Sequence, residues 1–322
     1  MTDDPLTYAE SGVDIADSEA ATDALVNALG DLDTDDYAGV LDIGDRYLAL
    51  ATDGVGTKLL VAEAVEDYST IGIDCIAMNA NDLVAMGIKP IGFVDYLAVD
   101  EPSESLAAEI GEGIAEGARQ ANLSLLGGET AVLPEIVTGF DLAGACVGIA
   151  EKGDLLKNNA EPGDVLIGFA SSGIHSNGLT LARKAIERHY DYSDQLPGGG
   201  NQTIGRALLE PTKLYTDLLS VLRNFPVHGA AHITGGGFTN LRRLGDYRYE
   251  ISDPFPRQPI FEVIQQAGAV TDEEMHRTFN MGTGFVLSVP EDVAEGIIEC
   301  SVGRVIGQVH EGEEILVRGC AL

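Results

Sequence analysis

The chain has 322 residues, of which 45% are hydrophobic, so it can bury a sizeable core and is long enough for two domains. Its 52 acidic and 19 basic residues give a net charge of −33, which argues against binding to nucleic acid or to anionic membranes. It lacks the about 18 uninterrupted apolar residues of a membrane helix, and its four scattered cysteines indicate neither a zinc site nor disulfides.

The acidic residues are spread along the whole chain, so the charge is a property of the surface. Adaptation to a cytoplasm of very high salt accounts for it, because salt screens the repulsion between like charges. The first residues are acidic and do not resemble the basic start of a signal peptide. We therefore expect a cytoplasmic protein.

Alternating hydrophobic patterns predict strands and helices in the first half of the chain. The predicted strands are 45–51, 90–99, 123–126 and 142–150, and the predicted helices are 71–86 and 103–121. Ser103 is placed to cap the second helix. The turn-rich stretch 153–164 is the candidate boundary, which divides the chain into domains 1–156 and 157–322.

The second half repeats this mixture of elements. The predicted strands are 165–170, 228–233, 285–289 and 305–309, and the predicted helices are 179–188, 204–209, 214–222 and one after the glycines at 235–237. We therefore predict an α+β fold with two α/β domains, of which the second has a mixed sheet, and we expect helices to cover one face of each sheet.

The first polar cluster, DGVGTK at 53–58, directly follows an apolar strand. Its glycines let the backbone approach a phosphate, Asp53 can hold Mg²⁺, and Lys58 can meet phosphate oxygens. The spacing is not that of a Walker A loop, and taken alone the segment is more often an ordinary turn. The candidate nucleotide-binding residues here are Asp53, Gly54, Gly56, Thr57 and Lys58.

The second cluster interrupts the apolar helix predicted at 71–86. Asn81 and Asp82 lie on it, Asp74 shares a face with Asn81, and Gly87 follows its end. A buried carboxylate is costly unless it is paired or binds a metal, so both aspartates are candidates for a site. The alternative is that they flank the solvent edge of a buried helix.

The third cluster is GGET at 127–130, which we place after a short strand. Ends of strands are where sheets present ligand-binding groups, so Glu129 and Thr130 are candidates. A tight turn with a solvated glutamate is the commoner interpretation of such a segment.

The fourth cluster, SSGIHSNG at 171–178, joins a strand to a helix, where backbone N–H groups can bind an anion. His175 can bind a phosphate or move a proton, although a lone histidine is usually structural. The candidate residues are Ser172, Gly173, His175, Ser176, Asn177 and Gly178.

The fifth cluster is HITGGGF at 232–238, again between a strand and a helix. Gly235, Gly236 and Gly237 suit a phosphate-binding nest, or equally a flexible turn. His232 is interpreted as a packed histidine at a strand end. Five glycine-rich, polar strand ends in one chain together predict a large ligand set with several phosphates.

In this order the chain contains ATDGVGTK, TIGIDCIAMNANDLVAMGIKP, GGETAVLP, ACVGIAEK, GDVLIGFASSGIHSNGL and AHITGGGFTNL. With this combination it resembles the phosphoribosylformylglycinamidine cyclo-ligases, also called aminoimidazole ribonucleotide synthetases. YAESGVDI, from Tyr8 onward, resembles the opening segment of that family. The resemblance extends over nearly the whole chain.

The resemblance implies an ATP-dependent ligase of purine biosynthesis. Such an enzyme converts formylglycinamidine ribonucleotide to 5-aminoimidazole ribonucleotide, with release of ADP and phosphate. It implies a homodimer whose N-terminal sheets pair into a barrel, an N-terminal ATP-binding domain and a C-terminal substrate domain. On this interpretation Asp53 and Asp82 hold Mg²⁺-ATP, Lys58 and His175 take part in catalysis, and Asp95 joins Glu129 on the ATP side.

The chain departs from the family pattern at three places, of which the first and third concern details of the nucleotide lid. Ala9 replaces a lysine, Ile88 replaces an alanine, and the short segment 37–45 replaces a Gly/Phe-rich loop. The alternatives are thiamine-monophosphate kinase, selenophosphate synthetase, a hydrogenase-maturation protein, or a non-catalytic nucleotide-binding module. The HSNG and GGGF motifs favour the cyclo-ligase over these.

Overall fold

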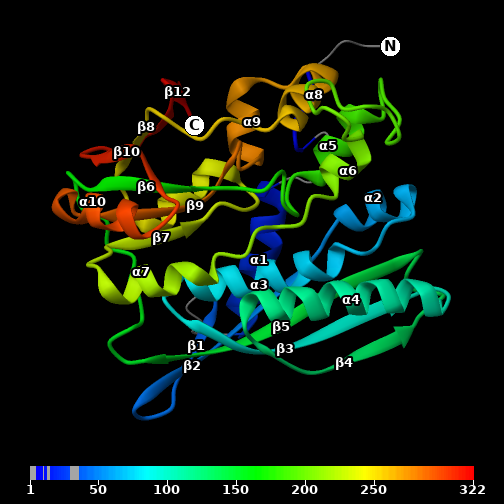
Figure 1. Ribbon diagram of the computed structural model, residues 1–322, viewed down its shortest axis with the longest axis horizontal. Helices are drawn as coiled ribbons and strands as arrows, with labels where there is room; N and C mark the ends of the chain where they lie inside the picture. Colours follow the sequence, from blue (N-terminus) through cyan, green and yellow to red (C-terminus); the bar gives the residue numbers. More distant parts are fainter. Residues whose placement is uncertain (1–4, 10, 13–14, 30–35) are drawn as a thin grey trace.

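The computed structural model describes residues 5–9, 11–12, 15–29 and 36–322. Two β-sheets, each with its own helices, form the lower and upper parts of the view in Figure 1. An N-terminal helix, α1 (Ile15–Leu29), precedes them. Within the described ranges, no helix is long and apolar enough to cross a membrane.

The first half forms a five-stranded sheet in the order β1-β2-β5-β3-β4, in which only β3 and β4 run parallel. Helices α3 and α4 cover one of its faces (Figure 1). The elements are β1 (Gly39–Asp42), β2 (Arg46–Gly54), α2 (Lys58–Val65), α3 (Ile71–Ala85), β3 (Lys89–Val99), α4 (Glu104–Ala121), β4 (Ser124–Val132) and β5 (Phe140–Glu151).

Helices α3 and α4 touch through glycines. A Cβ atom at Gly72 would lie 2.3 Å from the backbone nitrogen of Ile114, and one at Gly113 would lie 2.7 Å from the carbonyl oxygen of Ser69. Such distances leave no room for a larger residue, so the two backbones are in contact. Ser103 accepts a hydrogen bond from the backbone N–H of Leu106 and caps α4, as predicted.

The opposite face of the first sheet is open. Residues along β5 alternate between buried and half-buried, as expected when only one face is covered. We call the apolar side chains left exposed on the other side the open face: Leu50, Val94, Tyr96 and Leu126, with exposed fractions of 56%, 39%, 42% and 63%.

The second half forms a seven-stranded sheet in the order β12-β11-β8-β10-β6-β9-β7. Only the pair β8 and β11 is parallel, so the sheet is mixed, as predicted. The strands are β6 (Val165–Ala170), β7 (Gly229–His232), β8 (Arg248–Ile251), β9 (Thr283–Val289), β10 (Arg304–His310), β11 (Ile315–Val317) and β12 (Cys320–Ala321). The helices are α5 (Leu179–Ile186), α6 (Ile204–Leu208), η1 (Thr216–Leu218), α7 (Leu219–Asn224), η2 (Gly237–Leu244), α8 (Pro259–Gly268), α9 (Asp272–Thr278) and α10 (Glu291–Cys300).

The centre of this second sheet is covered on both faces. On β9, Phe285 and Leu287 pack in a cluster with α10, whereas Val286 packs in the other cluster with η2. All seven residues of β9 are buried. The expectation that helices cover one face of each sheet is therefore right for the first sheet and wrong for the centre of the second, where β9 is buried along its whole length.

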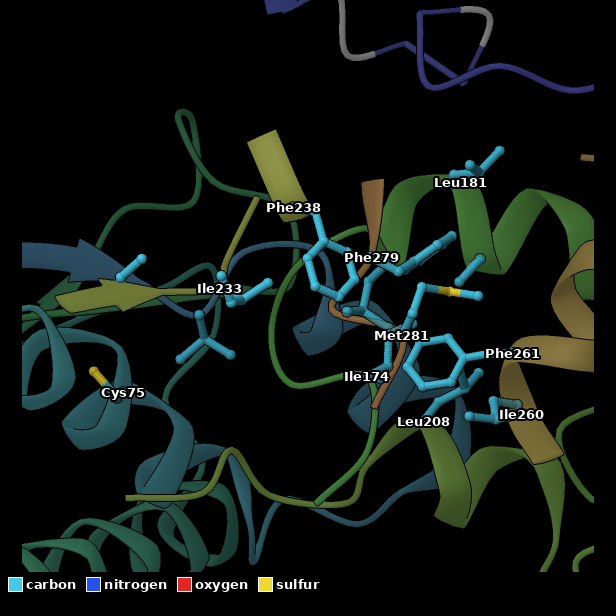
Figure 2. Close-up of a cluster of buried hydrophobic side chains, with 14 of the residues drawn as sticks. Cys75, Ile174, Leu181, Leu208, Ile233, Phe238, Ile260, Phe261, Phe279 and Met281 are labelled. Atoms are coloured by element: carbon cyan, nitrogen blue, oxygen red, sulfur yellow. The ribbon is translucent and has the colours of Figure 1, made fainter. Parts of the chain in front are cut away.

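Hydrophobic side chains anchor the two polar loops of the second half. Figure 2 shows Ile174, from SSGIHSNG, and Ile233, beside the three glycines, within the same cluster as Phe238 and Phe279. All four side chains are at most 1% exposed. Burial of these anchors fixes the polar atoms between them.

Most predicted elements are confirmed, and three differ. GGET lies inside β4, because the pairing with β3 continues to Val132. The helix after the glycines is the 3₁₀-helix η2, and the helix predicted at 214–222 begins at Thr216 as the 3₁₀-helix η1. The segment between β5 and β6 spans the predicted boundary, and the division at 156/157 stays a prediction.

Candidate active site

Two predicted carboxylates come together between the first sheet and α3. Asp53 stands near the end of β2, and Asn79 of α3 donates a hydrogen bond to its carbonyl oxygen at 3.1 Å. Burial, and then the negative charge of Asp82, raise the pKa of Asp53 to about 6. The Asp53 carboxylate therefore lies within the field of a second acid, where a bound cation would be stabilised.

His232 holds the second carboxylate. Its Nδ1 lies 2.9 Å from Oδ1 of Asp82, and its side chain is fully buried at the end of β7. The sequence interpretation of a packed histidine at a strand end is right about its burial. It missed the contact with Asp82, which joins the two halves of the molecule across 150 residues of sequence.

Tyr37 is a second residue that the sequence analysis missed. Its phenol oxygen accepts a hydrogen bond from the backbone N–H of His232 at 3.1 Å, and the Arg243 guanidinium lies 4.4 Å from the centre of its ring. Burial raises the pKa of the phenol, so it stays protonated. The only signal in the sequence was that Tyr37 opens the segment 37–45, where the family pattern is replaced.

The strand register places Asp53 and Asp95 in one row across the first sheet. Asp53 pairs with Gly144, Gly144 pairs with Asp95, and Asp95 pairs with Gly128. A Cβ atom at Gly128 would lie 2.3 Å from the Asp95 carboxylate, so glycine is needed there. Burial raises the pKa of Asp95. Both aspartates therefore lie on the covered face of the sheet.

Glu129 lies on the other side. It pairs with Tyr96, a residue of the open face, whereas Thr130 pairs with the buried Leu97. Neighbouring residues of a strand point to opposite faces of a sheet. Glu129 is therefore separated from Asp53 and Asp95 by the sheet, although the sequence analysis grouped them.

The first glycine cluster meets the second half of the molecule. Gly54 ends β2, Gly56 is exposed with φ +69°, and Thr57 precedes α2. The hydroxyl of Thr57 lies 2.9 Å from that of Thr180, at the start of α5. This contact brings DGVGT next to the SSGIHSNG loop, as a site shared between two ligands requires.

Lys58 does not face an open phosphate position. Its ammonium is fully buried, 2.8 Å from Oδ2 of Asp74, and donates to the carbonyl oxygen of Glu210 at 2.7 Å. Burial lowers the pKa of Lys58, and the Asp74 carboxylate opposes that shift. The expectation that Lys58 meets phosphate oxygens therefore does not hold in this structure, because its charge is already paired.

Asn81 and Gly87 are also structural. The Asn81 amide donates to the carbonyl oxygen of Lys213 at 2.9 Å and accepts from the N–H of Tyr215 at 2.9 Å. Gly87 is buried with φ +72° at the end of α3, where a Cβ atom would lie 2.5 Å from the carbonyl oxygen of Asp154. Both were candidates for ATP contacts. The amide of Asn81 is already hydrogen-bonded within the protein, and the space beside Gly87 is filled by the backbone of Asp154.

The SSGIHSNG loop holds a neutral histidine. Burial, and then the positive charges of His232, Lys58 and Lys213, keep the pKa of His175 well below its usual range. Its Nε2 accepts a hydrogen bond from the N–H of Ser172 at 3.3 Å, and its Nδ1 has no partner among the described residues. His175 is therefore a buried, neutral histidine with one ring nitrogen that no described residue satisfies.

The rest of this loop is close to the three glycines. The side-chain oxygen of Asn177 would lie 3.2 Å from a Cβ atom at Gly235. Gly173 packs against Glu210, and Gly178, with φ +75°, precedes α5 beneath Phe279. The two loops thus form neighbouring parts of one surface.

The three glycines are not equivalent. Gly235 is exposed and Gly236, with φ +89°, is half-buried. Gly237 is buried with φ +54°, and a Cβ atom there would lie 2.1 Å from the carbonyl oxygen of His276. The predicted anion-binding backbone is therefore reduced to Gly235 and Gly236, and Gly237 is needed for packing.

Across the part of the chain that the structure describes, no three or more His, Cys, Asp and Glu side chains form a ready metal site. Mg²⁺ usually binds through one or two carboxylates together with phosphates and water. Asp53 and Asp82, with His232 orienting the latter, fit such a site.

Two family models match this chain. Residues 35–150 match the N-terminal domain of the AIR synthase related proteins, and residues 161–318 match the C-terminal domain. The structure named AaThiL, complexed with AMPPCP and TMP, has the same fold, with a TM-score of 0.68 at 16% identity and 96% of each chain covered.

Curated relatives are much closer in sequence. The phosphoribosylformylglycinamidine cyclo-ligase of Methanosarcina acetivorans is 47% identical, with 97% of each chain covered. That of Pyrococcus horikoshii is 46% identical, over 96% of this chain and 94% of its own. The chain therefore belongs to the phosphoribosylformylglycinamidine cyclo-ligase family, within the AIR synthase related proteins.

Proposed function

We propose that this protein closes the imidazole ring of 5-aminoimidazole ribonucleotide from formylglycinamidine ribonucleotide, with conversion of ATP to ADP and phosphate. The family carries the proposal, and one observation supports it most: the Asp53, Asp82 and His232 group lies between the two halves. The loop that contains His175 reaches the same region, since the ring of Tyr215 lies 6.4 Å from the rings of both His175 and His232.

The chemistry needs activation of a poor leaving group. Transfer of the γ-phosphoryl group of ATP to the formyl oxygen makes that oxygen leave as phosphate when the ring nitrogen attacks the formyl carbon. The protein contributes positioning and neutralisation of charge. Asp53 and Asp82 would hold Mg²⁺, which neutralises phosphate charge when bound, and His232 keeps Asp82 in place.

We assign the remaining residues to two sides of the site. Gly54, Gly56, Thr57, Asp95 and Thr130 belong to the ATP side. Ser172, Gly173, Ser176, Asn177, Gly178, Gly235 and Gly236 belong to the ribonucleotide side, together with His175. Neutral His175 would accept or donate one hydrogen bond at the substrate, while exposed backbone N–H groups take the phosphate.

We also propose a homodimer that joins the open faces of two first sheets into a barrel. Leu50, Val94, Tyr96 and Leu126 expose apolar surface that a second copy would cover. Glu129 lies on this face and would contribute to ATP binding only once the dimer is formed. The net charge of −33 supports a cytoplasm of high salt as the place of work.

Turnover tests the function directly. Purified protein with ATP, Mg²⁺ and formylglycinamidine ribonucleotide should form aminoimidazole ribonucleotide, ADP and phosphate in equal amounts. ATP hydrolysis should require the ribonucleotide. Turnover of thiamine monophosphate or selenide in its place would disprove the assignment.

A further inference from the structure

One short segment of the second half, residues 209–215, is bound along helix α3 of the first half. Thr70 donates to the carbonyl oxygen of Leu209 at 2.9 Å, and Asn81 bonds the backbone of Lys213 and Tyr215. Between these points stands Asp74, on the same face of the helix. The segment is therefore held to α3 over its whole length.

Thr212 makes the central contact. Its backbone N–H and its hydroxyl oxygen lie 2.7 Å and 2.6 Å from the same oxygen of the Asp74 carboxylate. Lys58 completes the group: its ammonium donates a hydrogen bond to that same oxygen at 2.9 Å and lies 2.8 Å from the other carboxylate oxygen. The side chains of Lys58 and Asp74 are fully excluded from solvent, and Thr212 is 1% exposed, so water does not compete for these hydrogen bonds.

The Thr212 hydroxyl also reaches the substrate loop. Ser176 Oγ lies 3.2 Å from Thr212 Oγ1. A hydroxyl has one hydrogen to donate, and a carboxylate only accepts. Because Thr212 donates to Asp74, the hydroxyl of Ser176 must donate to Thr212. Ser176 then has only oxygen lone pairs left for a ligand.

We infer that Thr212 is a positioning residue that links the buried Lys58–Asp74 pair, between α2 and α3, to Ser176 on the ribonucleotide side. The link fixes the position of the SSGIHSNG loop relative to α3, which also carries Asp82. It also makes Ser176 an acceptor for an N–H or O–H group of the ribonucleotide, so the phosphate must be bound by other donors. This inference rests on the proposed function.

Thr212→Val tests the link, since it keeps the shape and removes the hydroxyl, and Thr212→Ser is the matched control. We expect Thr212→Val to lower kcat/KM for the ribonucleotide about tenfold or more, the effect of one charge-assisted hydrogen bond. The affinity for an ATP analogue should stay within about twofold. Thr212→Ser should restore the wild-type values.

Ser176→Ala provides a second route if Thr212→Val does not fold. The double variant Thr212→Val/Ser176→Ala should be no worse than the worse single variant, because both remove one shared link. Wild-type kinetics in Thr212→Val would overturn the inference. So would equal losses of ATP-analogue binding, ribonucleotide binding and melting temperature that Thr212→Ser does not repair, since these indicate a purely structural role.

The test separates the inference from the proposed function. If the wild-type protein binds the ribonucleotide but does not convert it, the proposed function fails. Calorimetry of ribonucleotide binding to the same variants then tests whether Thr212 links the two sides. A lower affinity in Thr212→Val that is absent in Thr212→Ser supports the inference, and equal affinities overturn it.

Discussion

All residues of β9, in the second sheet, are buried, whereas β2 and β3 of the first sheet keep one side in solvent. The centre of the second sheet packs against helices on both sides, and its buried residues join clusters that also contain residues of α3. The first sheet has Asp53 and Asp95 on its covered face and apolar side chains on its open face. Chemistry and association are therefore assigned to opposite faces of the same five strands.

A core substitution should show the difference most strongly. Phe285→Ala on β9 should lower the free energy of unfolding by about 3–5 kcal/mol, because it leaves a cavity in a fully enclosed site. Leu50→Ala on the open face should cost much less in the monomer. Urea denaturation at low protein concentration measures both, and equal losses would remove the contrast between the sheets.

The covered face of the first sheet should carry the catalytic effect. Asp53→Asn and Asp82→Asn should each lower turnover at least about 10²-fold, the loss expected for one electrostatic group of an active site. The melting temperature of Asp53→Asn should not fall, because one of two neighbouring negative charges is removed. Asp45→Asn, an exposed aspartate just before the same strand, is the control. Near-normal activity of both site variants would exclude these carboxylates from the site.

The open face should respond through association. The double variant Val94→Lys/Leu126→Lys should sediment as a monomer, because it places charges in the apolar surface that a second copy would bury. Val302→Lys alters an apolar residue that is 70% exposed in the second half and should leave the dimer intact. A dimer that survives the double variant would show that the copies meet elsewhere.

Salt should have the smallest effect, counted per charged residue. The net charge is −33, and the Debye length falls from about 30 Å at 0.01 M to about 3 Å at 1 M salt. Melting temperature, dimer fraction and activity should all rise between dilute buffer and molar KCl. Melting curves and sedimentation that do not change over this range would contradict adaptation to high salt.

Local patterns were enough to predict much of the fold. The strand before DGVGTK, the helix at 71–85 and the cap at Ser103 all follow from spacing and short-range chemistry. Burial of the second sheet on both faces also left a signal, since FVLSV at 285–289 is nearly continuous in apolar residues. Such a continuous apolar run predicts a strand and is also typical of burial on both faces.

Contacts between distant residues could not be predicted in this way. Lys58 bonds to Glu210 across 152 residues and His232 to Asp82 across 150, so no local pattern records either contact. The face of Glu129 depends on an irregularity: Phe93 pairs with Leu125, but Val94 pairs with Gly127. The extra residue on β4 reverses which residues of that strand face each side of the sheet. Strict alternation along the sequence would therefore place Glu129 on the wrong face.

The glycine contact between α3 and α4 extends the list of positions at which inherited variation can alter the enzyme. An α-helix rises about 1.5 Å per residue, so Gly72 is about 15 Å along α3 from Asp82. A methyl group at Gly72 would push α3 away from the backbone of α4. Asp74, Asn81 and Asp82 would move together, because all three lie on α3. A change remote from either ligand would thus reach the catalytic groups by displacement of the whole helix.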